Sequence, residues 1–124
     1  MEQQLHLKLT IRLCTDDQRR CFGPGIATLL EQVQLHHSLR AAAAAMEMAY
    51  SKAWRIVKTA EDAFGFKLLA STIGGHHGGG ASLTPEAKQL LAAYRAYQED
   101  VSRYAEERFT DAFQFCQSFP THQA

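Results

Sequence analysis

Hydrophobic and polar residues alternate along the first stretch of the chain. The apolar positions are Leu5, Leu7, Leu9, Ile11 and Leu13, and the polar positions between them are His6, Lys8, Thr10 and Arg12. A repeat of two residues is typical of a strand with one buried face, so residues 5–13 are predicted to form an N-terminal strand. Asp16 and Asp17 then begin a turn, and the Phe-Gly-Pro-Gly segment at 22–25 breaks the chain again.

The spacing of apolar residues becomes helical after this break. Pro24 suits the first turn of a helix, because its missing N–H has no partner to lose there. The apolar residues that follow it at helical spacing are Ile26, Leu29, Leu30 and Val33. Ser38 is a favourable N-cap for a second, short and alanine-rich helix over residues 39–46.

A third helix is predicted over residues 51–64, with Ser51 as its cap and Gly65 at its C-terminal end. Its apolar face consists of Ala53, Ile56, Val57, Ala60 and Phe64. Its opposite face carries Lys52, Arg55, Lys58 and Thr59. Trp54 lies beside the apolar face and is expected to pack between helices rather than to contact a ligand.

Two short strands and a long helix complete the pattern. Residues 68–73 and 81–83 are predicted to pair as a hairpin, whose tip at 74–80 is rich in glycine. Thr84, Pro85 and Glu86 then form a favourable helix start. No helix breaker follows before Pro120, so the helix is expected to reach about Gln117.

The long helix carries a stripe of large apolar residues. Its members are Leu90, Tyr94, Tyr97, Val101, Tyr104, Phe109 and Phe113. The early spacings of four and three residues resemble a heptad repeat. A helix roughly 50 Å long extends beyond the core of so small a domain. The stripe therefore predicts a homodimer with these residues in its interface.

Composition narrows the possible functions. The chain has 124 residues, of which 46% are hydrophobic, and its 13 basic and 13 acidic side chains give zero net charge. This favours one folded domain over a disordered tail or a highly charged coat on nucleic acid. Residues 38–84 hold five basic and three acidic side chains, which makes them the electropositive part, at net +2. With no export signal, no membrane-spanning segment and an odd count of three cysteines, the chain is expected to be cytoplasmic.

The order of these elements is typical of a winged helix-turn-helix, in a fold that is mostly α with a small amount of β. Two short helices joined by a tight turn are followed by a two-stranded hairpin, and the second helix is basic on its outer face. Lys52 and Arg55 lie in the first turns of that helix, which is the part that reaches base edges and phosphates in this geometry. The glycine-rich tip lets a hairpin backbone approach the sugar-phosphate chain.

Three segments of the chain closely resemble the DNA-binding half of ModE-type molybdate-responsive transcription regulators. These are Phe-Gly-Pro-Gly at 22–25, Ser-Leu-Arg-Ala-Ala-Ala at 38–43 and Met-Ala-Tyr-Ser-Lys-Ala-Trp at 48–54. The wing sequence at 78–85 extends the match, and the layout is more distantly similar to LysR-type regulators. The resemblance implies a dimer, paired through the N-terminal strand and the long helix, that binds a pseudo-palindromic operator. It also implies that Ser51, Lys52, Arg55 and the wing glycines face DNA.

The chain departs from this family in two respects. Full-length molybdate regulators carry C-terminal oxyanion-binding domains, for which this chain has no room, so molybdate sensing is not expected. Wings of the family tend to carry a basic residue where this chain has His76 and His77, which weakens attraction to phosphate near neutral pH. The predicted division is a DNA-binding domain over 1–84, with the helix-turn-helix at about 38–65 and the wing at about 68–83, and a dimerisation helix over 85–118.

The sequence therefore predicts a homodimeric transcription regulator that binds double-stranded DNA. Its expected DNA contacts are Arg40, Tyr50, Ser51, Lys52, Arg55, Lys58, Thr59, His76, His77 and Gly78. No arrangement of residues typical of a catalytic site is recognised, and no cofactor is predicted. No metal site is predicted either, because the two histidine pairs lack accompanying cysteine ligands. The alternative is a degenerate winged helix that binds proteins and only weakly binds DNA. The sequence does not show whether a separate effector-sensing protein is a further partner.

Overall fold

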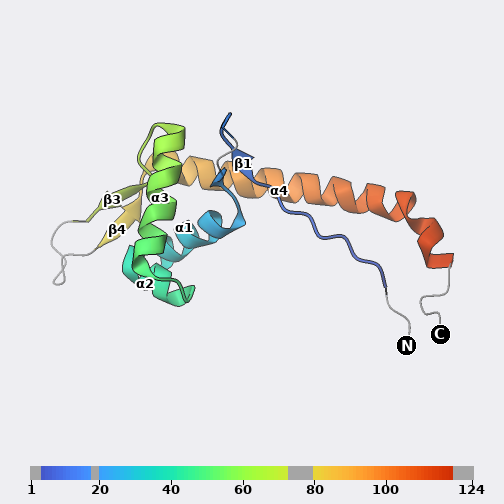
Figure 1. Ribbon diagram of the computed structural model, residues 1–124, viewed down its shortest axis with the longest axis horizontal. Coiled ribbons are helices and arrows are strands. Elements are labelled where there is room, and N and C mark those ends of the chain that lie inside the picture. Colours follow the sequence, from blue (N-terminus) through green and yellow to red (C-terminus); the bar gives the residue numbers. More distant parts are fainter. Residues whose placement is uncertain (1–3, 18–19, 73–79, 119–124) are drawn as a thin grey trace.

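The computed structural model describes residues 4–17, 20–72 and 80–118. Its elements are β1 (Leu13–Cys14), β2 (Arg20–Phe22), α1 (Pro24–His36), α2 (Leu39–Ala45), α3 (Tyr50–Phe64), β3 (Leu69–Ser71), β4 (Ala81–Leu83), α4 (Pro85–Ala112) and the 3-10 helix η1 (Gln114–Ser118). The first three helices and both small sheets gather around the start of α4, which then extends away from them (Figure 1). This is the predicted fold class, a winged helix-turn-helix followed by a long C-terminal helix.

Three helix boundaries follow the predicted capping chemistry. The N–H of Ala41 donates to the Ser38 side chain at 3.0 Å, and the N–H of Ala87 donates to Thr84 Oγ1 at 3.1 Å. Each serine or threonine oxygen thus satisfies one of the N–H groups left free at a helix start. Gly65 ends α3 with φ of 80°, in the left-handed region that favours glycine.

The start of α3 differs from the prediction that Ser51 caps it. The helix begins at Tyr50, and its N-cap is Ala49, whose side chain cannot accept a hydrogen bond. The turn before it is instead stabilised by backbone, because the N–H of Met48 donates to the carbonyl of Ala43 at 2.9 Å. Glu47 takes the left-handed conformation in this turn, with φ of 54°. Ser51 is consequently exposed on the first turn of α3 and free to contact a ligand.

One hydrophobic core joins the first three helices, the two small sheets and the start of α4. Its fully buried large side chains are Phe22, Leu29, Leu30, Leu68 and Val33. The small residues Ala42 and Ala43 of α2 and Ala53 and Ala60 of α3 are also buried, which lets these helices pack closely. The first turns of α4 contribute Ala87, Leu91 and Tyr94 to the same core.

Glu61 is the buried charged residue of α3 and joins this helix to β3. Its side chain is 8% exposed, and its Oε2 accepts hydrogen bonds from the N–H groups of Leu68 at 2.8 Å and Leu69 at 3.3 Å. Lys58 and Lys67 place their ammonium groups 3.8 and 3.7 Å from Oε1. Because an ionised carboxylate is costly to bury without partners, these four contacts explain how the position tolerates a glutamate.

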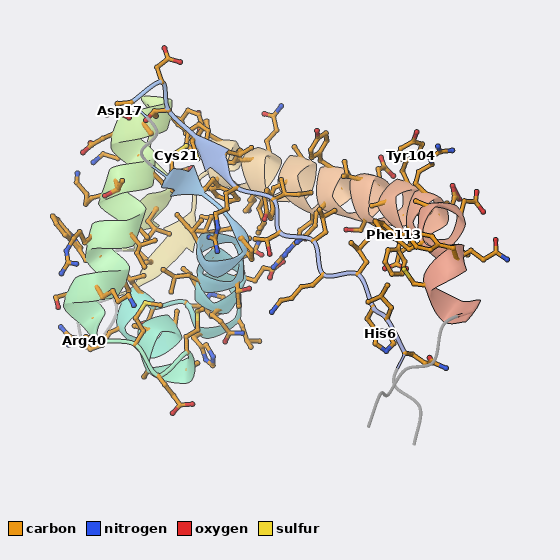
Figure 2. The ribbon with its side chains drawn as sticks, turned by 45° about the vertical axis from the view of Figure 1, so that its right-hand side comes forward. His6, Asp17, Cys21, Arg40, Tyr104 and Phe113 are labelled. Carbon is orange, nitrogen blue, oxygen red and sulfur yellow. The ribbon has the colours of Figure 1, made fainter. Side chains whose placement is uncertain are left out.

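The N-terminal strand predicted over residues 5–13 is largely wrong. Only Leu13 and Cys14 form a strand, β1, which pairs antiparallel with β2 across a turn at Asp16 and Asp17. Residues 4–12 run along α4 toward its C-terminal end without strand pairing (Figures 1 and 2). The alternating pattern sets the faces of a strand, but a strand also needs a neighbouring strand, and none of the described residues pairs with residues 4–12.

The long helix is also shorter than predicted. It ends at Ala112 rather than near Gln117, and the chain continues as the 3-10 helix η1. Phe113 leaves helical geometry at this point, with its N–H still donating to the carbonyl of Phe109. Tightening into 3-10 geometry is a common way to satisfy the last carbonyls of a helix, and it needs no proline.

Candidate nucleic-acid interface

The outer face of α3 presents polar and basic side chains. Ala53, Val57 and Ala60 are buried against the core, which leaves Ser51, Lys52 and Arg55 exposed on the other side. Within the described parts of the chain, neither Lys52 nor Arg55 has an ion-pair partner. Their cationic groups are therefore available to an external anion.

Trp54 does not follow the sequence prediction, whereas the predicted DNA contact of Lys58 stays a prediction. Trp54 is 49% exposed rather than packed between helices, and the Lys58 ammonium lies 5.8 Å from the centre of its ring. Position 54 precedes Lys58 by one helical turn, and this spacing already indicated the outer face. The Lys58 ammonium also lies 3.8 Å from Oε1 of Glu61, which partly neutralises its charge. Thr59 is half-buried next to it.

Arg40 and Tyr50 form a stacked pair where α2 meets α3. The guanidinium carbon of Arg40 lies 4.2 Å from the centre of the Tyr50 ring. Both side chains are exposed, and Figure 2 shows Arg40 on the outer surface beside the start of α3. A stacked guanidinium loses less freedom on binding because its orientation is already restricted, while its N–H donors stay available.

The predicted wing is present, but its tip lies outside the described residues. Strands β3 and β4 pair antiparallel, with Leu69 opposite Leu83 and Ser71 opposite Ala81. His76, His77 and Gly78 lie outside the described residues, so their contact with DNA stays a prediction.

An open groove borders α3 on the side of β1 and β2. It has a volume of about 510 Å³ and lies between Lys52 and Arg55 of α3 on one side and Arg12 and Cys21 on the other. Burial raises the pKa of the Cys21 thiol above its ordinary value, which favours the protonated form. The sequence prediction missed Arg12, although its polar position in the alternating segment was a usable signal.

The seven residues predicted to form a dimer interface fall into two groups. Tyr94 is 4% exposed, and its hydroxyl donates to the carbonyl of Ile11 at 2.7 Å, while Leu90 packs against the same core. These two side chains belong to the chain's own core, because the start of α4 completes that core.

Beyond Tyr94 the stripe on α4 is exposed to solvent. Tyr97, Tyr104 and Phe113 are 59%, 64% and 46% exposed, and Val101 and Phe109 are half-buried. Figure 2 shows Tyr104 and Phe113 on the part of α4 far from the other helices.

In the described parts of the chain, no three histidine, cysteine, aspartate or glutamate side chains come together as metal ligands. No described helix is long and apolar enough to cross a membrane.

Comparison with known proteins agrees with the helix-turn-helix geometry. Residues 27–88 match the model of the bacterial regulatory helix-turn-helix protein family of LysR type. The chain is similar to the molybdenum transport protein ModE of Azotobacter vinelandii, at 32% identity over 82 residues, and to that of Herbaspirillum seropedicae, at 35% over 92 residues. It is also similar to the molybdenum-pterin-binding protein MopB of Rhodobacter capsulatus, at 33% over 81 residues.

The matched segments cover 63%, 74% and 65% of this chain, but only 30%, 31% and 30% of the respective relatives. The chain thus spans about a third of the length of these relatives. The family match covers half of the chain and runs from α1 into the start of α4. The chain therefore belongs to the LysR-type family of bacterial regulatory helix-turn-helix proteins, with a DNA-binding domain of the ModE type.

Proposed function

We propose that the protein binds double-stranded DNA as a homodimer and inserts α3 into the major groove. The observation that carries this proposal is the exposed, unpaired state of Lys52 and Arg55 on the outer face of α3. A major groove about 12 Å wide admits one helix, whose early turns contact base edges. Ser51 and Trp54 flank the two cations on that face and complete the contact surface.

The neighbouring elements supply phosphate contacts in this arrangement. Arg40 binds the DNA backbone from α2, with its guanidinium held by Tyr50. The wing approaches the backbone next to α3, through the predicted contacts His76, His77 and Gly78. Lys58 and Thr59 lie one turn further along α3 and make weaker contacts, because Lys58 also interacts with Glu61.

The dimer forms through the distal part of α4. Exposed aromatic side chains at Tyr97, Tyr104 and Phe113 support this, since large apolar groups repeated along one helix are costly in water. Tyr94 and Leu90 position the helix from inside the core. A two-fold dimer places two copies of α3 on half-sites about one helical turn apart.

We further propose that these 124 residues bind DNA without themselves recognising molybdate. This is supported by the assignment of the exposed cations to DNA. The expected result is that added molybdate leaves the DNA affinity of this chain unchanged. A molybdate-dependent change in affinity would contradict this part of the proposal.

Substitution of Arg55 tests the recognition face. Arg55→Ala is expected to lower affinity for a specific duplex by roughly 1–3 kcal/mol without changing the mass of the dimer. Arg103→Ala is the matched control, because Arg103 is equally cationic and exposed but lies on α4 and pairs with Glu99 and Asp100. Equal DNA affinity of Arg55→Ala and the parent would refute the assigned face.

Substitution of Val101 tests the dimer. Val101→Asp places a charge in the centre of the proposed interface and is expected to give monomers in sedimentation equilibrium, at a concentration where the parent is dimeric. The control is Ser102→Asp, which adds the same charge one position round the helix. A dimer that tolerates Val101→Asp would show that the interface lies elsewhere.

A further inference from the structure

Arg12 and the basic residues of α3 face one groove from opposite sides. Arg12 precedes β1, whereas Lys52 and Arg55 come from the first half of α3, and all three line the same open groove. The groove contains no carboxylate among its described lining residues, and its walls include the apolar side chains of Phe22, Ile26 and Ile56. Among the described residues, no carboxylate forms an ion pair with any of these three cationic side chains, which makes this groove a site for an anion.

The start of α1 opens into the same groove. Its N-cap is Gly23, which provides no side-chain hydrogen bond, and its first turn holds no acidic residue. Gly25, in that first turn, lines the groove. The Nη1 atom of Arg12 lies 3.2 Å from the position that a Cβ on Gly23 would occupy, so the guanidinium lies across the helix start. Free N–H groups at a helix N-terminus add a positive potential to that of the three side chains.

The position of the groove indicates which anion it takes. In the view of Figure 1, β1 lies on one side of α3 and the wing strands β3 and β4 lie on the other. When a helix lies in the major groove of DNA, the two sugar-phosphate chains run along its sides rather than beneath it. The wing then meets one backbone and the groove beside β1 meets the other.

We propose that this groove binds a backbone phosphate of the DNA and that Arg12 is a phosphate-binding residue. The inference rests on the proposed function, because it requires α3 to enter the major groove. Arg12 donates to the phosphate oxygens from one side, Lys52 contributes from the other, and the start of α1 faces the same group. A phosphate contact of this kind fixes the position of the protein on DNA without reading the base sequence.

The test compares the salt dependence of DNA binding for the 124-residue parent, Arg12→Gln and Arg12→Lys. Affinity is measured between about 50 and 200 mM salt on a duplex selected by the parent from a random library and on a shuffled duplex. Removing one phosphate contact is expected to make the slope of log K against log salt shallower by about 0.9, and Arg12→Lys is expected to restore it. Because the contact does not read sequence, Arg12→Gln should weaken both duplexes by the same factor.

Arg103→Gln serves as the charge-matched control, since Arg103 lies on α4 beyond the core, and it should leave the slope unchanged. Circular dichroism confirms that each variant is folded, which is expected because Arg12 is exposed. An unchanged slope for Arg12→Gln would overturn the inference, as would a loss confined to the selected duplex, which is the sign of a base contact. If the parent binds neither duplex, the proposed function fails instead.

Discussion

Glu61 is expected to determine how firmly α3 is held against strand β3. Replacing it with alanine removes the acceptor for the N–H groups of Leu68 and Leu69. Leu68 is fully buried, so its N–H cannot turn to water for a substitute partner. A buried donor left without a partner costs about 1–3 kcal/mol, and bonds to an ionised acceptor lie in the upper part of this range.

The remaining contacts of Glu61 add little. Lys58 and Lys67 are 37% and 69% exposed and approach only to 3.8 and 3.7 Å, so each ion pair is worth at most about 1 kcal/mol. The second hydrogen bond, to Leu69, is long at 3.3 Å and partly exposed. Together these contributions predict that Glu61→Ala lowers the free energy of unfolding by about 2–4 kcal/mol.

The assay is urea unfolding at one fixed protein concentration, because the stability of the proposed dimer would depend on concentration. Asp62→Ala is the matched control. It removes the same charge from the adjacent exposed position of α3 and is expected to change stability by less than about 0.5 kcal/mol. Glu61→Gln keeps one oxygen acceptor and should lie between these two variants. A loss below about 0.5 kcal/mol for Glu61→Ala would refute the reasoning, because the two N–H groups would then have other partners.

Three further predictions concern other parts of the molecule. Tyr94→Phe removes the hydroxyl that donates to Ile11 and should lower the free energy of unfolding by about 1 kcal/mol in urea; no loss would contradict the role of this bond. The hydrogen bond from Arg95 lowers the pKa of Glu31 below its ordinary value of 4.5. The stability that the ionised Glu31 contributes is therefore fully present above pH 4.5 and is lost as the pH falls through the lowered pKa. The difference in unfolding free energy between the parent and Glu31→Gln should therefore shrink below about pH 4.5, and a pH-independent difference would contradict it. Trp54 is the single tryptophan and is exposed on α3, so its fluorescence should change on titration with a bound duplex, and constant emission at saturation would place DNA elsewhere.

The sequence predicted the helices and the starts of α2 and α4 well because local chemistry determines them. Ser38 and Thr84 cap their helices as expected, and the apolar faces of α1 and α3 are buried as their spacing indicates. A side-chain cap and a repeat of apolar residues act within one or two turns, so both can be read without knowing the rest of the fold.

Features that depend on distant partners were predicted poorly. The alternating segment at 5–13 has the pattern of a strand, but pairing requires a neighbour, and only Leu13 has one within the described residues. The stripe on α4 gave no sign that Tyr94 would be buried in the core while Tyr97 stays exposed. That distinction depends on where the core ends, which the spacing of apolar residues does not contain.

The candidate site was predicted in its centre but not at its border. Lys52 and Arg55 lie on the exposed face of α3 because helical spacing alone separates them from the buried alanines. Arg12 lies forty residues before Lys52 in the chain, and only folding brings both to one groove. The polar position of Arg12 in the alternating segment indicates exposure, but no local pattern shows which distant residues it lies beside.

Selection of bound duplexes from a random DNA library, at moderate salt and followed by sequencing, tests the central claim most directly. A homodimer that reads DNA through α3 should enrich a two-fold symmetric motif, with half-sites about one helical turn apart. The Arg55→Ala variant should enrich this motif less strongly than the parent. Binding without any enriched motif, and lost as the salt concentration rises, would leave only attraction to phosphate and would contradict sequence-specific recognition.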